Sequence, residues 1–107
     1  MATYKINLTL LDRLIIPAIL PKAGGLVEQV TQRGITAKIE FTPEEVEEFE
    51  MQDAEKGVIF NPVKAKDIEI EFLQNEVDLL KKTANQLNEE HKITQENLDT
   101  VLKINNL

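Results

Sequence analysis

Apolar residues recur at two spacings along this chain, and the changes between them divide it into helical and extended segments. Residues 4–8 alternate apolar and polar, which fits either a short edge strand or an extended lead-in. From Thr9 the spacing is helical, with Thr9 as the N-cap and Asp12 in the capping-box position. Because Pro17 lies inside this pattern, we expect it either to kink the helix or to end it at Ile16.

The segment after Pro21 has a less regular pattern. A second helix is expected to begin near Gly25, after a turn that contains two glycines and a proline. Gly34 interrupts its apolar stripe, which consists of Leu26, Val27, Val30 and Ala37. Residues 35–41 also alternate apolar and polar, so they fit a strand as well as a helix, and the pattern leaves both open.

The sharpest local signal begins at Thr42. Thr42 can cap a helix, a proline follows at the first helical position, and Glu45 completes a capping box. Phe41 and Val46 have the spacing of a hydrophobic staple across this cap. We therefore expect a short helix that turns Val46 and Phe49 toward the core.

Beyond this helix the period changes to two. Strands are expected around residues 50–53, 58–61 and 67–72, with a hairpin turn at "AEKG" in which Gly57 supplies a positive φ. The residues of the last strand that should share a buried face are Ile68, Ile70 and Phe72. These segments predict a small antiparallel sheet of about three strands.

From Leu73 to the C-terminus the pattern is helical again, in two segments separated by "EEHK". The apolar stripe of the first consists of Leu73, Val77, Leu80, Ala84 and Leu87. It fits packing against the sheet or another helix, and it also fits an oligomeric seam between copies of the chain. The last helix should be capped at Thr94 and carries Leu98, Val101 and Leu102. The chain is thus predicted to be α+β, with N-terminal helices, the small sheet and two C-terminal helices.

The composition places the chain among folded proteins. A length of 107 residues predicts a single domain over residues 1–107 with one core. Hydrophobic residues make up 42% and charged residues 29%, which argues against disorder. The formal net charge of −7 disfavours polyanionic partners, so we expect no direct nucleic-acid contact.

The absence of cysteine excludes disulfides and thiolate metal sites and fits a reducing cytoplasm. The most apolar run, residues 14–20, contains a proline and falls well short of the roughly 20 residues that span a bilayer. No small-residue cleavage site follows it, so no signal peptide is predicted. We expect a cytoplasmic protein that does not contact membranes.

An acidic run, residues 42–55, is a candidate functional surface. On a helix beginning at Pro43, Glu44 and Glu48 are one turn apart and Glu47 lies beside them. The run lacks the D-x-[DN]-x-[DN]-G spacing of a calcium loop, so no metal site is predicted. The pattern fits a solvated helix face and, as a sharper alternative, an acidic contact surface for a basic partner.

Groups that could carry catalysis are scarce. His91 is the only histidine, and both serine and cysteine are absent, which leaves no recognisable triad or nucleophile. Carboxylates adjacent on one helix face also lack the opposed geometry of a glycosidase pair. For His91 we expect an exposed position at the end of a helix. The sequence therefore predicts a protein that is not an enzyme and uses no cofactor.

The sequence "PKAGG" precedes an expected helix N-terminus and allows a site for a small anion or nucleotide. Lys22 would supply positive charge there, and the backbone amides of Gly24 and Gly25 would donate hydrogen bonds. The run lacks both G-x-x-x-x-G-K-[ST] and G-x-G-x-x-G. A plain turn is the simpler interpretation, and anion binding is kept as an alternative.

The order of these features resembles that of small proteins encoded in tailed-bacteriophage and prophage genomes. The resemblance rests on "LIIPAILPKAGG", "IEFTPEEVEEFEM", "GVIFNP", "IEIEF" and two helices separated by "EEHKIT", and it spans nearly the whole chain. Pro17 and Gly34 depart from it, because they interrupt segments where an unbroken helix would be simpler. The resemblance implies a non-enzymatic protein that binds a host or phage protein in the host cytoplasm and acts on host machinery or defence. The alternatives are a minor virion or assembly protein and a homo-oligomeric scaffold.

Overall fold

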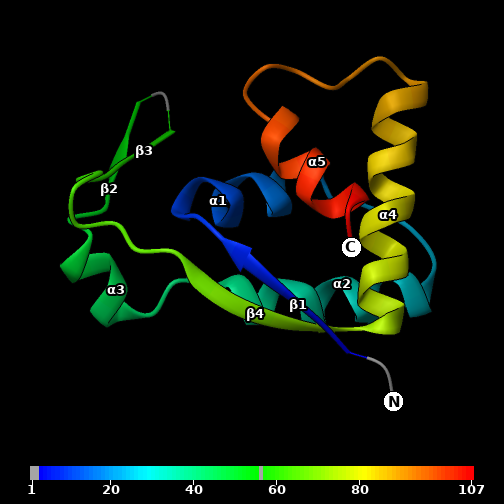
Figure 1. Ribbon diagram of the computed structural model, residues 1–107, viewed down its shortest axis with the longest axis horizontal. Helices are drawn as coiled ribbons and strands as arrows, with labels where there is room; N and C mark the ends of the chain where they lie inside the picture. The colour runs from blue at the N-terminus through cyan, green and yellow to red at the C-terminus, as the bar shows by residue number, and fades with distance from the viewer. Residues whose placement is uncertain (1–2, 56) are drawn as a thin grey trace.

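The chain folds as an α+β protein, as the sequence predicts (Figure 1). The computed structural model describes residues 3–55 and 57–107, and over these ranges it contains five helices and four strands. The helices are α1 (Leu10–Ile19), α2 (Leu26–Ile39), α3 (Pro43–Glu48), α4 (Gln74–Glu89) and α5 (Leu98–Asn105). The strands are β1 (Thr3–Leu8), β2 (Gln52–Ala54), β3 (Gly57–Ile59) and β4 (Ile68–Leu73).

Within the described ranges, the strands form two separate two-stranded sheets and not one sheet of about three strands. β1 pairs antiparallel with β4, with Leu8 opposite Ile68 and Thr3 opposite Leu73. β2 pairs antiparallel with β3, and this hairpin stands apart from the β1–β4 pair in Figure 1. Residues 4–8 are therefore part of a strand and not an extended lead-in.

The hairpin begins later in the sequence than expected because of the way in which α3 ends. Glu50 adopts a left-handed conformation with a φ of 55°, and the Met51 amide donates to the Val46 carbonyl over 2.9 Å. A bond of this span is typical of a Schellman-type helix ending. Residue 50 thus belongs to the end of α3, and β2 begins only at Gln52. Gly57 has the positive φ that the turn was predicted to need, 131°.

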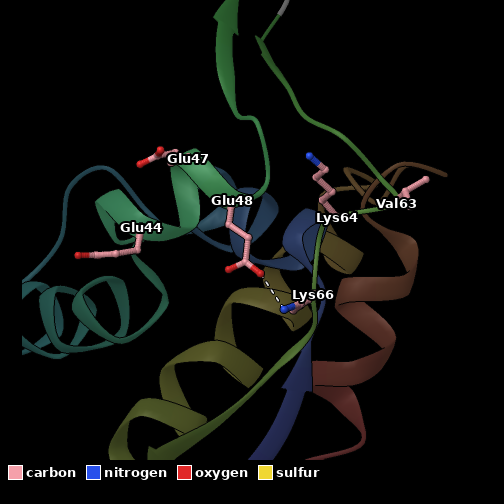
Figure 2. A pocket seen from close by; sticks show the side chains of 6 residues that line it. All are labelled: Glu44, Glu47, Glu48, Val63, Lys64 and Lys66. Atoms are coloured by element: carbon pink, nitrogen blue, oxygen red, sulfur yellow. Dashed lines mark ion pairs between the residues drawn. The ribbon is translucent and has the colours of Figure 1, made fainter.

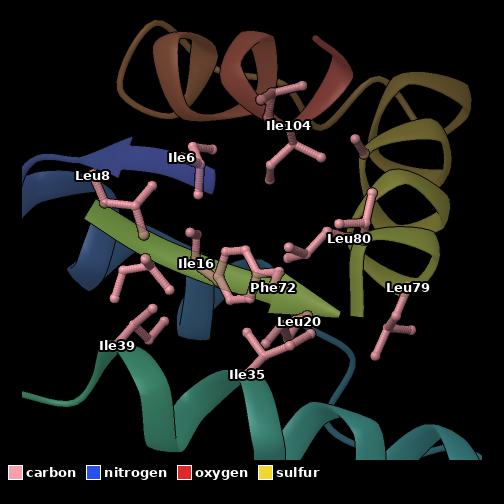
Figure 3. Close-up of a cluster of buried hydrophobic side chains, with 14 residues drawn as sticks. Ile6, Leu8, Ile16, Leu20, Ile35, Ile39, Phe72, Leu79, Leu80 and Ile104 are labelled. Carbon is pink, nitrogen blue, oxygen red and sulfur yellow. The ribbon is translucent and has the colours of Figure 1, made fainter. Parts of the chain in front are cut away.

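The hydrophobic core lies between the inner face of the β1–β4 pair and the helices α1, α2, α4 and α5 (Figure 3). Ile70 and Phe72 face it from β4, whereas Glu69 and Glu71 are exposed, so the predicted alternation of this strand is confirmed. The buried apolar residues of the core are Ile6, Leu8, Ile16, Leu20, Ile35, Ile39, Ile70, Phe72, Val77, Leu79, Leu80, Ala84, Val101 and Ile104.

The apolar stripe of α4 packs into this core. Val77, Leu80 and Ala84 are buried, and Leu87 packs against the core from its edge. Leu73 remains exposed because it is the last residue of β4 and the N-cap of α4. The central residues of this stripe therefore pack inside the chain. The alternative of a seam between copies at these positions is not supported, since its central residues are covered by the chain's own strands and helices.

α2 is helical as far as Ile39, so the strand alternative for residues 35–41 is wrong. Ile35 and Ile39, one turn apart, are the residues that α2 buries. The predicted packing stripe lies on the outside instead, since all four of its members are exposed: Leu26, Val27, Val30 and Ala37. The close approach of α4 explains this rotation: a Cβ on Gly34 would lie 2.9 Å from Glu76 Oε2, so the glycine faces α4.

Two other helix boundaries differ from the predicted ones. α1 continues through Pro17, so it does not end at Ile16. Thr94 exchanges hydrogen bonds with Asn97, in which the Thr94 amide donates over 2.8 Å and the Asn97 amide over 3.2 Å. This is the predicted cap, but residues 95–97 form a turn and α5 begins only at Leu98. None of the helices in the described ranges is long and apolar enough to cross a membrane.

Candidate protein-binding surfaces

Three helices begin with a buried or half-buried carboxylate that has two roles. Each one accepts a hydrogen bond from the backbone at the start of its own helix and also pairs with a cation of another element. The three pairs are Asp12–Lys103, Glu45–Arg13 and Glu76–Lys38. Among the described residues, no buried side-chain nitrogen or oxygen lacks a hydrogen-bond partner. These charges therefore join elements of the fold to one another.

Arg13 is the most strongly engaged of these side chains. It is 1% exposed and forms a bidentate pair with Glu45, with N···O distances of 2.6 and 2.9 Å. It also donates to the backbone carbonyls of Ile39 over 3.1 Å and Glu40 over 2.9 Å, and its guanidinium lies 4.0 Å from the Phe41 ring centroid. The side chain from α1 thereby joins the C-terminal end of α2 to the start of α3.

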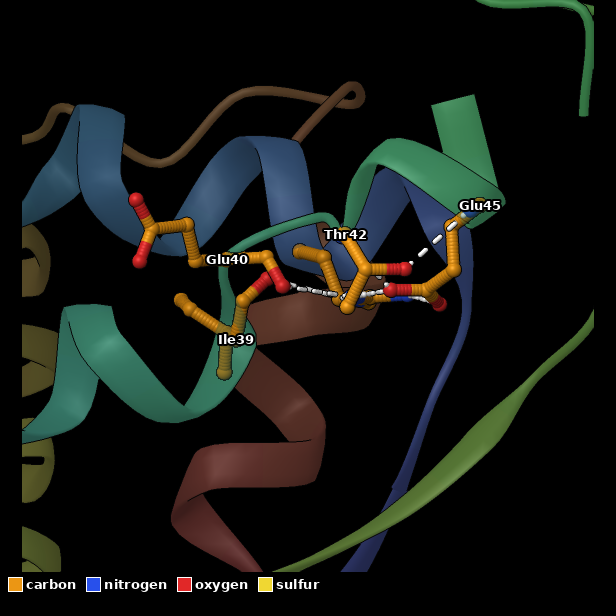
Figure 4. A network of polar contacts seen from close by, with 5 residues as sticks. Ile39, Glu40, Thr42 and Glu45 are labelled. Atoms are coloured by element: carbon orange, nitrogen blue, oxygen red, sulfur yellow. Dashed lines mark hydrogen bonds and ion pairs between the residues drawn. The ribbon is translucent and has the colours of Figure 1, made fainter. Parts of the chain in front are cut away.

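Figure 4 shows this junction, where Glu45 lies close to Thr42 and to the last residues of α2. The Thr42 amide donates to Glu45 over 3.0 Å and the Glu45 amide donates to the Thr42 hydroxyl over 3.1 Å. The hydrogen bonds from Arg13 outweigh the opposing effect of burial and, with the Thr42 backbone bond, lower the pKa of Glu45 to about 2. Glu45 is consequently ionised at neutral pH and fixed in place.

Asp12 occupies the equivalent position at the start of α1. It accepts from the Thr9 amide over 3.0 Å and from the Thr100 hydroxyl over 2.6 Å, and it pairs with Lys103. Burial raises the pKa of Asp12, but the hydrogen bonds from Lys103, Thr100 and the Thr9 backbone lower it on balance below its ordinary value. Asp12 is therefore a structural carboxylate that ties α1 to α5.

The acidic face predicted on α3 is only partly acidic in three dimensions (Figure 2). Glu44, Glu47 and Glu48 are all exposed on this helix. The loop after the hairpin brings two lysines to its side, and the resulting pairs are Lys66–Glu48 at 2.7 Å and Lys64–Glu50 at 3.0 Å. Within the described ranges Glu44 and Glu47 have no ion pair. The free acidic surface of α3 is thus smaller than the sequence run suggests.

The apolar side of α3 is also less buried than predicted. Phe49 faces the core and is 2% exposed, but Val46 is 40% exposed. The prediction that Val46 turns inward is therefore wrong. α3 has only six residues and ends at Glu48, so it has a single buried anchor, at the residue that closes its last turn.

No catalytic or metal-binding cluster emerges from the described residues. Over residues 3–55 and 57–107, no three His, Asp or Glu side chains come together as a metal ion requires. His91 is exposed just after α4 and has a φ of 55°, so it ends the helix as predicted. No second titratable group is bonded to it in this part of the chain. The site residues of this protein have to be sought among its exposed surfaces.

The candidate anion site falls at the start of α2. Lys22, Gly24 and Gly25 are exposed, and Gly25 is the N-cap of the helix. The Glu28 carboxylate lies beside Gly24, with Oε1 3.4 Å from the position of a Cβ at that glycine. A carboxylate of the chain itself therefore occupies the neighbourhood of this helix N-terminus, which disfavours a second negative charge.

α1 is apolar on both of its faces. Its inner face contributes Ile16 to the core, and Leu20, the C-cap that follows the helix, is also buried, while Leu11 on the outer face is 54% exposed. The apolar residues of the outer face are Leu11, Leu14, Ile15 and Ala18. Clustered apolar side chains that a helix leaves exposed are typical of interaction sites, so this outer face is a candidate contact surface. The helical spacing of these residues in "LLDRLIIPAI" predicts the helix, but it was not interpreted as a contact surface.

A groove of about 600 Å³ follows this outer face. Residues 57–58 of the hairpin and residues 94–97 before α5 form its other sides. Leu11 and Ile15 line it and also line a second hollow toward α5, where Leu102 is exposed. The two hollows therefore form one continuous surface, which we call the α1 groove. Its size is in the range of pockets that hold several side chains of a partner.

A second exposed apolar group lies at the start of α2, away from the α1 groove in the sequence. Leu26 is 83% exposed and Val27 78% exposed, and Val30 follows one turn after Leu26. We call these three residues the α2 patch. Gln29, Gln32 and Arg33 lie on one side of it, and Glu28, Asp78 and Lys82 lie beside Val27 on another, so its margin is polar and carries charges of both signs. The patch is small, but it is contiguous along one helix.

Comparison of the chain with known protein families, with curated proteins and with solved structures finds no match. No relative therefore supplies a function or a set of site residues. The functional assignment has to rest on the chemistry of the exposed surfaces, of which the α1 groove is the largest apolar one described above.

Proposed function

We propose that this chain is a non-enzymatic protein-binding domain and that the α1 groove is its contact surface. The observation that carries the proposal is the outer face of α1, where leucine and isoleucine side chains line a groove that none of the residues 3–55 and 57–107 covers. Contiguous exposed apolar surface of this kind is typical of interaction sites. Among the described residues, each buried charged side chain is paired with an opposite charge on another element, which supports binding in preference to catalysis.

The partner that we propose is a host or phage protein in the host cytoplasm, and this part of the proposal rests on the resemblance to small bacteriophage proteins. The excess of negative charge, −7 over the chain, favours a basic partner. Glu44 and Glu47 on α3 would then act at longer range, by attracting a basic surface and speeding its association. This role is more modest than that of a contact site, because Lys64 and Lys66 neutralise part of the same face.

Photo-crosslinking tests the proposal. A photoreactive phenylalanine analogue replaces Leu11 in the α1 groove in one variant and Leu26 in the α2 patch in a matched control, since both leucines are exposed. In extract of the source cells we expect a protein adduct of one defined mass at position 11 and not at position 26. The proposal is wrong if position 11 gives no adduct, or gives the same adducts as position 26.

Self-association, as in a scaffold or an assembly component, is the second candidate function. The α2 patch supports it, because three adjacent apolar side chains on an exposed helix can pair with the same patch of a second copy. Sedimentation at increasing protein concentration tests this alternative. Association that Leu26→Asp abolishes, together with a chain-to-chain adduct from position 26, is the expected result. A strict monomer at all concentrations contradicts it.

A further inference from the structure

The shape of the α1 groove restricts what can occupy it. Its floor is a helix whose outer apolar residues, Leu11, Ile15 and Ala18, are spaced one turn apart along the axis. A helix offers no free backbone groups along its length, so an extended segment would find no hydrogen-bond partners on this floor. A second helix satisfies its own backbone and can pack its side chains between those of α1. The ten residues of α1 provide about 15 Å of such contact.

The charges at the edge of the groove restrict the occupant further. Glu96 and Asp99, both exposed, line its end toward α5, and neither has an ion pair within the described ranges. Lys103 is the one cation among the residues that line this end, and it is held by Asp12 and by the Asn7 carbonyl over 3.2 Å. This end of the rim is therefore negative, and it is complementary to a basic segment.

We infer that the α1 groove binds a basic amphipathic helix of another protein. The apolar face of that helix packs on Leu11, Ile15 and Leu102, and its lysine or arginine side chains lie against Glu96 and Asp99. A second copy of this chain that docked through the same surface is a poor occupant of this groove, because it would bring its own Glu96 and Asp99 against those already at the edge. The inference rests on the proposed function and specifies the partner's chemistry.

The test uses two synthetic helical peptides of about 14 residues, roughly four turns. Both carry leucines along one face; one has lysines on its other faces and the second has glutamates in the same places. Binding is followed by fluorescence anisotropy of the labelled peptide at low and at high salt. We expect binding of the lysine peptide that weakens as salt is added, and no binding of the glutamate peptide.

Substitutions in the groove locate the site. Leu11→Asp should weaken binding of the lysine peptide at least about tenfold, and an aspartate in the first turn of α1 is compatible with the helix. Leu26→Asp, the matched control in the α2 patch, should leave the affinity unchanged. Glu96→Gln with Asp99→Asn should weaken binding about threefold or more at low salt, and the difference should shrink at high salt.

Several results would overturn the inference: no binding of the lysine peptide, equal binding of the glutamate peptide, or equal effects of Leu11→Asp and Leu26→Asp. These failures are separate from failure of the proposed function. If position 11 forms a protein adduct but the lysine peptide does not bind, protein binding stands and the basic helix is wrong. If the peptide binds in the groove but no adduct forms, the proposed cellular role fails.

Discussion

The junction between Arg13 and Glu45 gives the most quantitative prediction. Glu45→Gln keeps the size of the side chain and one oxygen that can accept from the Thr42 amide, as in other capping boxes. It removes the negative charge and one of the two acceptors that face Arg13. Because the Arg13 side chain is 1% exposed, the variant leaves a buried guanidinium without its counter-charge, with the carbonyls of Ile39 and Glu40 and a single side-chain oxygen at position 45 as acceptors.

The magnitude follows from the pKa of Glu45, which falls from an ordinary 4.5 to about 2. At about 1.4 kcal/mol for each pH unit, this fall corresponds to at most about 3.5 kcal/mol of folding free energy. The Glu45 side chain is 19% exposed, so solvent screens part of the interaction. We therefore expect Glu45→Gln to lower the free energy of unfolding at pH 7 by about 2 kcal/mol.

The pH dependence has a defined sign. The folded state lowers the pKa of Glu45, so the stabilisation is fully present above pH 4.5 and is lost as the pH falls toward 2. Urea unfolding followed by circular dichroism should show the largest gap between the two proteins at neutral pH and a closing gap below pH 4.5. Glu44→Gln on the same helix, without an ion pair in the described ranges, should change stability by about 0.5 kcal/mol or less. A gap that is constant with pH, or no larger than that of Glu44→Gln, would refute the reasoning.

Three further substitutions test the packing and the buried pairs by urea unfolding. Leu80→Ala should cost about 2–5 kcal/mol because this side chain is fully buried, whereas Leu26→Ala should cost less than about 0.5 kcal/mol; equal effects would contradict the assignment of core and surface. Asp12→Asn should cost about 2–4 kcal/mol, since it leaves the α5 cation without its carboxylate, and a loss below about 0.5 kcal/mol would contradict a structural role. An alanine in place of a helical glycine normally stabilises a protein by about 1 kcal/mol, but Gly34→Ala should not, because its Cβ would meet Glu76. In a Glu76→Ala background the same substitution should give this stabilisation. A gain in both backgrounds would contradict the close approach of α2 and α4.

Features that depend on nearby residues were predictable from the sequence. The capping boxes at Thr9 and Thr42 involve residues three apart, and both are present. The alternation of β4 and the positive φ of Gly57 are likewise local, and both are confirmed. These signals were enough to establish the α+β class and the order of most elements.

Features that depend on distant contacts were not predictable in the same way. Arg13 bonds groups that are 26 to 32 residues away in the sequence, and its own neighbours give no sign of them. The orientation of α2 about its axis depends on the contact between α4 and Gly34. The apolar residues at the start of α2 are therefore exposed, although the sequence predicted that they would be packed. Glu44, Glu47 and Glu48 do share a helix, but the lysines that neutralise part of that face come from a loop.

The outer face of α1 could have been recognised from the sequence, because its apolar residues predict a contact surface as well as a helix. Its apolar residues are too many for a helix with a single buried face, and the excess is what the structure leaves exposed along the α1 groove. This mismatch between the helix sequence and its surroundings is the basis of the proposed binding function.

Competition between the cellular partner and the lysine peptide tests the central claim most directly. The chain with the photoreactive residue at position 11 is irradiated in extract of the source cells, with and without an excess of the peptide. We expect a defined protein adduct that the lysine peptide suppresses and the glutamate peptide does not. An adduct that persists undiminished with the lysine peptide present, or the absence of any adduct at position 11, would contradict the claim that the α1 groove binds a basic helix of a partner protein.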